Sequence, residues 1–143
     1  MIMGNAMLKT TFVFSLIIAA VITAASTAQA QSSGPVYELR IYTAVEGKLD
    51  AVNARIRDHA IKLFQKHGME AVGFWVAADP PASQTTLYYI LRHKSREAAK
   101  ASWDAFFKDP AWIKARNESE ANGKILDKYE SVFLTPTAFS KLK

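Results

Sequence analysis

PVYELRIYT, residues 35–43, alternates apolar and polar side chains as a β-strand with two different faces does. Tyr37, Leu39 and Ile41 fall on one face, and Glu38, Arg40 and Tyr42 fall on the other. The two opposite charges leave the strand on the same side, with Cα atoms roughly 6.5 to 7 Å apart. This strand begins the fold and carries the first candidate site.

Residues 1–30 have the features of a secretory signal peptide, because Lys9 precedes an apolar run over 12–22 and small residues lead to Ala28-Gln29-Ala30. The run is too short to cross a membrane as a helix, which needs roughly twenty residues. We therefore expect cleavage before Gln31, no stable membrane anchor, and a periplasmic or secreted protein.

Residues 31–143 have the size of one ordinary domain. The chain has no cysteine, which excludes disulfide scaffolds and thiol enzymes. This region has seventeen Lys and Arg against thirteen Asp and Glu, a formal charge of +4. The two signs are interleaved, as in RIRDHAIK (55–62), so we expect no nucleic-acid partner.

The rest of the chain divides into helices and strands with recognisable boundaries. Apolar residues at helical spacing fill 49–67 before Gly68, and Ser95 and Asp109 are suited to cap two further helices. Further strands are predicted at 71–77, 85–93 and 127–134, the first of them stopped by Asp79-Pro80-Pro81.

This order predicts an α+β, ferredoxin-like βαββαβ protomer with a four-stranded antiparallel sheet and its helices on one face. The other face would be left bare, although soluble monomers avoid large apolar patches. We therefore expect a homodimer that docks sheet to sheet and encloses a barrel-like cavity. Glu38, Arg40 and Tyr42 are expected to line that cavity.

Several segments in order resemble the NIPSNAP family: YELRIYT, the Gly47-Lys48-Leu49 helix start, DHAIKLFQKHG (58–68), VGFW (72–75) and DPAW (109–112). The resemblance runs from about residue 36 to 136 and implies a dimeric α/β barrel. The residues that match the family pattern are Tyr37, Glu38, Arg40, Tyr42, His59, His67, Gly68, Gly73, Phe74 and Trp75. The family has no agreed reaction, and relatives of the same barrel include cofactor-free monooxygenases, isomerases and haem-binding proteins.

Glu38 and Arg40 have two interpretations, which are compatible with each other. They would act as a polar anchor for a ligand carboxylate, carbonyl or phenol, with the Tyr42 hydroxyl nearby. They would equally act as a structural ion pair that fixes the register of the dimer, and we favour this second interpretation.

An aromatic wall for the same pocket is predicted from Trp75, Tyr89 and His93, which are equally suited to the core. We prefer Tyr89 and His93 because histidine titrates near physiological pH. The alternative face of that strand carries Tyr88, Ile90 and Arg92.

No metal site or cofactor is expected from the sequence. His59 and His67 are eight residues apart on one helix and lack the one-turn spacing of paired metal ligands. Haem ligation by a histidine ranks behind a structural role. Trp103, Phe106, Phe107 and Trp112 are interpreted as packing between helix and sheet.

Three functions remain open at this point. The leading one is binding of a small apolar or aromatic molecule in the cavity, through Glu38, Arg40, Tyr42, Trp75, Tyr89 and His93. The first alternative is a cofactor-independent monooxygenase or isomerase with Tyr42 or His93 as acid or base. The second is a structural or interaction dimer without a ligand, which a cavity of roughly 300 Å³ or more would argue against.

Overall fold

The computed structural model describes residues 34–142. The elements follow one another as β1 (Val36–Ala44), α1 (Leu49–Arg55), η1 (Ile56–Ala60), α2 (Ile61–Lys66), β2 (Glu70–Val76), α3 (Ala82–Thr85), β3 (Thr86–His93), α4 (Arg96–Lys108), α5 (Pro110–Ser119) and β4 (Leu126–Leu134). This confirms the predicted α+β, ferredoxin-like order. The predicted signal peptide lies outside the described residues, so export stays a prediction.

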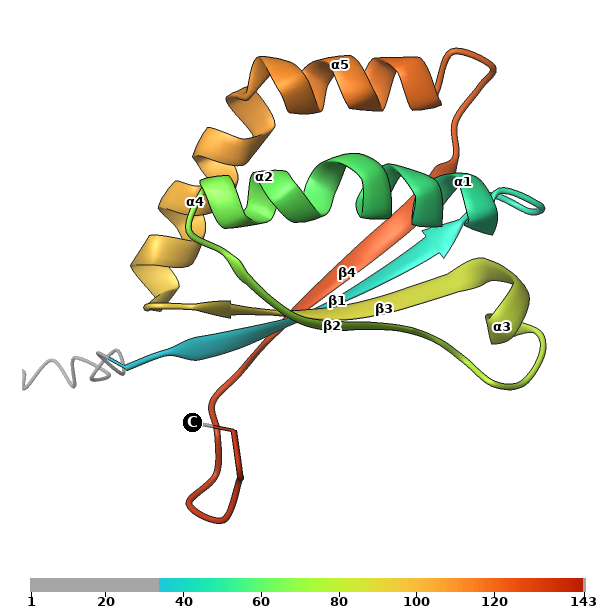
Figure 1. Ribbon diagram of the computed structural model, residues 1–143. Coiled ribbons are helices and arrows are strands. Elements are labelled where there is room, and N and C mark those ends of the chain that lie inside the picture. Colours follow the sequence, from blue (N-terminus) through green and yellow to red (C-terminus); the bar gives the residue numbers. More distant parts are fainter. Residues whose placement is uncertain (1–33, 143) are drawn as a thin grey trace, which may run out of the picture.

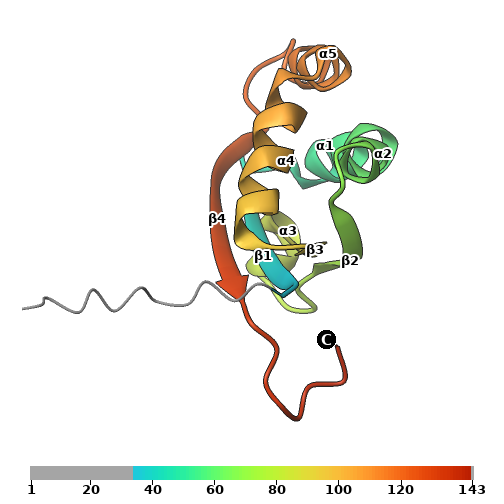
Figure 2. The same cartoon turned by 90° about the vertical axis from the view of Figure 1, so that its left-hand side faces the viewer.

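The four strands form one antiparallel sheet in the order β2-β3-β1-β4. Helices α1, α2, α4 and α5 lie on one face of this sheet, as Figures 1 and 2 show from two sides. The core fills the space between that face and the helices. Its fully buried side chains include Val52, Phe64, Tyr89, Leu91 and Phe106.

The helix boundaries follow the sequence signals closely. Gly68 follows the first helical segment with φ +75°, a conformation that favours glycine. The Ser95 side chain accepts a hydrogen bond from the Ala98 N–H at 3.1 Å and caps α4. Asp109 caps α5 in the same way, at 2.9 Å from the Ala111 N–H. The π-helical turn η1, between α1 and α2, was not predicted.

The side chains of Glu38, Arg40 and Tyr42 lie on the helix-covered face of the sheet. The indole of Trp103 in α4 contacts Glu38 directly, and Glu38 is only 1% exposed. The expectation that these three residues face the bare side was therefore wrong. Alternation along a strand tells which residues share a face, but it does not tell which face the helices cover.

The opposite face of the sheet carries mainly apolar side chains. Leu39 and Ile41 of β1 are half-buried there, and Val132 of β4, paired with Leu39, is 44% exposed. The C-terminal residues after β4 run along this side (Figure 1). They border a cavity together with Tyr37 and Ile90. In the part of the chain that is described, no helix covers this face, which we call the uncovered face.

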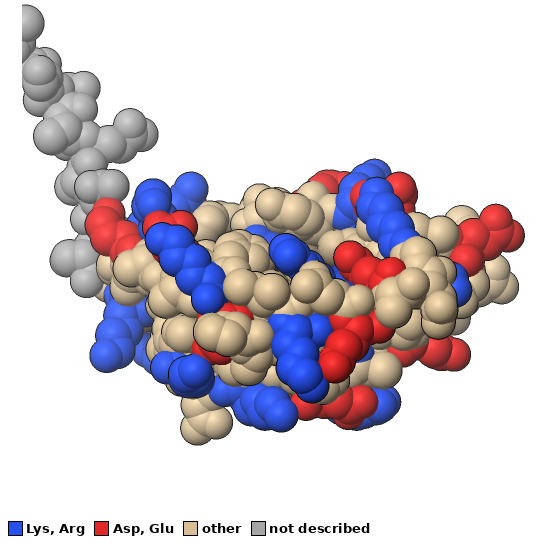
Figure 3. Space-filling model, turned by 90° about the horizontal axis from the view of Figure 1, so that it is seen from above, with Lys and Arg blue, Asp and Glu red and all other residues tan. Residues whose placement is uncertain are grey.

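The helix-bearing surface carries basic and acidic side chains that are interspersed over the visible face (Figure 3). Among residues 34–142, none of the helices has the length and apolar composition needed to cross a membrane.

Candidate functional site

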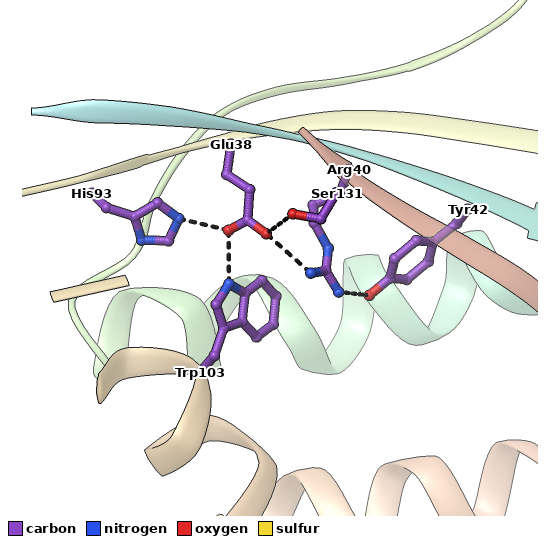
Figure 4. Close-up of polar contacts among 6 residues, drawn as sticks. All are labelled: Glu38, Arg40, Tyr42, His93, Trp103 and Ser131. Atoms are coloured by element: carbon purple, nitrogen blue, oxygen red, sulfur yellow. Dashed lines mark hydrogen bonds and ion pairs between the residues drawn. The ribbon is translucent and has the colours of Figure 1, made fainter. Parts of the chain in front are cut away.

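The Glu38 carboxylate lies at the centre of a buried polar cluster (Figure 4). Its Oε1 accepts hydrogen bonds from Arg40 Nη1 at 3.0 Å and from Ser131 Oγ at 2.6 Å. Its Oε2 accepts from Trp103 Nε1 at 2.7 Å and lies 2.9 Å from His93 Nε2. Since an ionised carboxylate only accepts, the histidine carries its proton on Nε2. Each oxygen thus has two partners.

The strand register explains why these side chains meet. Glu38 is paired with Leu91 of β3 on one side and with Phe133 of β4 on the other. His93 and Ser131 each lie two residues from one of these partners, so both face the same side as Glu38. Helix α4 packs against this face and supplies the indole of Trp103 (Figure 4).

The hydrogen bonds keep Glu38 ionised in spite of its burial. Burial is the largest single influence on the pKa of Glu38, and it acts to raise that pKa. The hydrogen bonds from His93, Ser131 and Trp103 lower it, as does the positive charge of Arg40. The lowering influences prevail, and the pKa falls from its ordinary value of 4.5 to about 2.

Arg40 is held by aromatic rings as well as by Glu38. Its guanidinium carbon lies 4.3 Å from the ring centroid of Trp103 and 4.6 Å from that of Tyr129. Its Nη2 donates to the Tyr42 hydroxyl at 3.3 Å. Within the described chain, the Nε–H of Arg40 is left without a hydrogen-bond partner, although the residue is 95% buried (5% exposed).

A cleft of about 530 Å³ opens between α4 and β4 beside this cluster. Glu38 and Arg40 are the buried charged residues of its lining. The other lining residues are Arg96, Glu97, Lys100, Trp103, Asp104, Phe107, Tyr129, Ser131 and Phe133. The cleft therefore combines a buried ion pair with four aromatic side chains.

The structure brings most of the predicted site residues together. Glu38, Arg40, Tyr42 and His93 belong to one hydrogen-bonded cluster. Tyr89 lies next to it, with its ring centroid 5.1 Å from that of Tyr42. Of these, only Glu38 and Arg40 line the cleft, whereas Tyr42 and His93 are enclosed behind them.

Trp75 lies apart from this cluster. It belongs to β2, the edge strand at the opposite end of the sheet from β4, and it is 50% exposed. It borders a separate cavity of about 370 Å³ with Ile56, Phe74 and Leu87. Within the described part of the chain, neither Glu38 nor Arg40 lines that cavity.

Four residues of the site were not predicted from sequence patterns: Trp103, Tyr129, Ser131 and Phe133. Trp103 does pack between helix and sheet, as expected, and its indole N–H adds a second role. The three β4 residues alternate along one face, a signal that was present but could not be assigned to the Glu38 side without the register.

His67, for which a structural role was predicted, makes a side-chain contact between two helices. Its Nε2 lies 2.8 Å from Asp109 Oδ2, so the end of α2 is tied to the cap of α5. Over residues 34–142, no three His, Asp or Glu side chains gather in a way that would hold a metal ion.

Comparisons with known proteins identify the family. A sequence model of the NIPSNAP family matches residues 37–141. The chain belongs to the NIPSNAP family. A comparison with curated proteins finds no match to this NIPSNAP chain.

Solved NIPSNAP structures share the fold. A NIPSNAP family protein of unknown function from Agrobacterium tumefaciens superimposes with a TM-score of 0.65 at 20% identity, covering 78% of this chain and 96% of that protein. An uncharacterized NIPSNAP-like domain protein from Burkholderia xenovorans gives a TM-score of 0.64 at 14% identity, covering 76% of this chain and 90% of that protein. These identities establish a common fold and leave the activity of this NIPSNAP protein open.

We predict that Glu38→Gln lowers the free energy of unfolding of this NIPSNAP protein by about 3 to 5 kcal/mol, because it leaves the buried Arg40 without its counter-ion. The matched control is Glu70→Gln, which breaks the exposed Arg92–Glu70 pair at 3.1 Å and should cost no more than about 1 kcal/mol. Urea unfolding followed by circular dichroism measures both. Equal effects of the two substitutions would contradict a buried, stabilised carboxylate.

We also predict a specific loss of stability in acid. The pKa of Glu38 is lower in the folded protein than in the unfolded chain, so its contribution is present above about pH 4.5 and is lost as the pH falls toward 2. A shift from 4.5 to about 2 corresponds to about 3 kcal/mol. Lys66 and His67 lower the pKa of Asp109 as well, so the wild type carries both contributions.

The Glu38→Gln variant separates these two contributions. It should lose less stability than the wild type between about pH 4.5 and 2.5. The variant keeps the contribution of Asp109 but no longer has that of Glu38. Urea midpoints across this pH range measure the difference. Parallel pH profiles for wild type and variant would show that Glu38 titrates normally.

Proposed function

We propose that this NIPSNAP protein binds a small, partly aromatic molecule in the cleft between α4 and β4. The observation that carries this proposal is the buried Arg40–Glu38 pair in the lining of a cavity of about 530 Å³. That volume lies within the range of about 300 to 1,000 Å³ typical of small-molecule sites.

The composition of the walls supports an aromatic or apolar ligand. Trp103, Phe107, Tyr129 and Phe133 provide ring surfaces around the cleft. Tyr129 is 57% exposed, and Phe107 is also exposed. Exposed aromatic side chains beside a few fixed polar groups are characteristic of ligand pockets, since the rings supply contact area and the polar groups orient the ligand.

The geometry favours binding over chemistry. Tyr42 and His93 were the candidate acid and base, and neither lines the cleft. Burial raises the pKa of the adjacent Tyr89 well above its ordinary value of 10.0, so this hydroxyl stays protonated near neutral pH. The structural interpretation of the Glu38–Arg40 pair is compatible with binding, because a pair that fixes the fold also holds its cleft-lining atoms in place.

The proposal predicts that Phe107→Asp weakens binding by about tenfold or more, because it puts a charge into an apolar wall. The control is Phe139→Asp, which changes a fully exposed phenylalanine of the C-terminal segment outside the cleft. Saturation-transfer NMR with one-ring and two-ring aromatic probes measures the affinities. If both variants bind the probes like the wild type, or if the wild type binds none, the cleft is not a ligand site.

We propose in addition that two copies associate through the uncovered face. Trp75, Val132 and Leu134 are each more than 40% exposed, and Leu39 and Ile41 lie half-buried on the same face. An apolar surface of this kind is costly to leave in water, and a second copy would cover it symmetrically. Such a dimer would not enclose Glu38, Arg40 or Tyr42, whose side chains lie on the helix side.

The proposed dimer predicts that Val132→Asp raises its dissociation constant by about a hundredfold or more, because an unpaired carboxylate would be buried at the interface. Ile113→Asp is the control, since Ile113 is similarly exposed but belongs to α5 on the helix side. Light scattering at micromolar concentration gives the masses. A monomeric wild type would contradict the interface.

A further inference from the structure

We infer that the molecule bound in the α4–β4 cleft is an anion, an aromatic ring system that carries a carboxylate, and that Arg40 is the residue that contacts this group. This inference rests on the proposed binding function and specifies the chemical class of the ligand. It follows from the number of hydrogen-bond donors and acceptors on Glu38 and Arg40 that have no partner within the protein.

Glu38 has no hydrogen-bonding capacity to offer a ligand. Its two carboxylate oxygens already have four partners at 2.6 to 3.0 Å, from two strands, α4 and its own strand. A ligand that needed to donate a hydrogen bond to Glu38 would have to displace one of them. The carboxylate therefore acts as a positioning group for Arg40 and not as a contact for the ligand.

Arg40, in contrast, has donors to spare. A guanidinium has five N–H groups, and two of those of Arg40 are used, one by Glu38 and one by Tyr42. The donors that remain are one N–H on each Nη nitrogen and the Nε–H, and the Nε atom is itself shielded from solvent, with no hydrogen-bond partner within residues 34–142. The spare N–H groups of the two Nη nitrogens are therefore the donors that Arg40, a residue of the cleft lining, has left for ligand oxygens.

The orientation of the guanidinium is fixed before any ligand arrives. The rings of Trp103 and Tyr129 lie against it, and the Glu38 contact at 3.0 Å fixes one end of the fork. A planar, pre-oriented guanidinium is matched to the two oxygens of a carboxylate. A ligand ring would extend from there toward Phe107 and Phe133, the apolar part of the lining.

The mouth of the cleft adds a second guanidinium. Arg96 lies with its guanidinium carbon 3.7 Å from the ring centroid of Phe133, and no ion pair involves it among the residues described. Lys100, its neighbour on α4, is already paired with Asp104 at 2.6 Å. Glu97 also borders the mouth, but it is exposed to solvent, where its charge is screened more strongly than the buried charge of Arg40.

A cationic ligand would be rejected by the same geometry. Glu38 balances the charge of Arg40 at 3.0 Å, but both of its oxygens are occupied, so a cation would find no free acceptor on this buried pair. An anionic head group, which accepts hydrogen bonds, should therefore bind in preference to an ammonium group on the same ring system, which only donates them.

The test is a comparison of 2-naphthoate with 2-naphthylmethylamine, which share a ring system and differ in the sign of their charge. Isothermal titration calorimetry on the purified protein should show naphthoate binding about tenfold or more tightly than the amine. Arg40→Lys keeps the charge but loses the planar fork, and it should reduce the affinity for naphthoate by about tenfold. The control Arg92→Lys changes an arginine outside the cleft and should leave the affinity unchanged.

A second measurement needs no variant. The guanidinium ¹⁵N–¹H NMR signal of Arg40 in the wild-type protein should shift when naphthoate is added and should stay in place when the amine is added. An amine that binds as tightly as naphthoate, or a bound naphthoate that leaves this signal in place, overturns the anion inference while the proposed binding function survives. If no aromatic probe of any charge binds, the proposed function fails together with the inference.

Discussion

A carboxylate that is removed from water must be surrounded by donors, and this requirement organises one half of the protein. Glu38 obtains its donors from β1, β3, β4 and α4, so four elements that are distant in sequence converge on one side chain. Breaking any of these contacts would expose a buried charge to an apolar surrounding, which costs far more than the contact itself contributes. The cluster therefore fixes α4 over the sheet at one particular position.

The same requirement explains how the cleft keeps its shape. Helix α4 packs against the sheet through Trp103. The indole N–H of this residue donates to Glu38, and its ring lies against the guanidinium of Arg40. The two cleft walls, α4 and β4, are thus joined at their base through the buried pair. Such a buried pair adds little net stability compared with apolar residues of the same size, but it specifies one arrangement of side chains.

Much of the fold could be predicted from local chemistry. Strand alternation, the caps at Ser95 and Asp109 and the glycine at position 68 each depend on neighbours in sequence, and the structure confirms all of them. The candidate site could be predicted in part, because Glu38, Arg40 and His93 were assigned to one pocket. Which face the helices cover depends on tertiary packing, and two charged residues suggest the exposed side unless their partners are known. Trp103 and Ser131, more than sixty residues from Glu38 in sequence, were out of reach of local patterns for the same reason.

The missing Cβ at Gly73 allows the side chain of Trp75 to lie against strand β2. An added Cβ would lie 2.6 Å from the ring of Trp75, which folds back over the backbone of its own strand. The indole thus occupies the space that a side chain at position 73 would otherwise fill. Any side chain at this position would push this half-exposed ring away from the strand, so a change as small as one methyl group would reshape the surface that β2 presents to solvent.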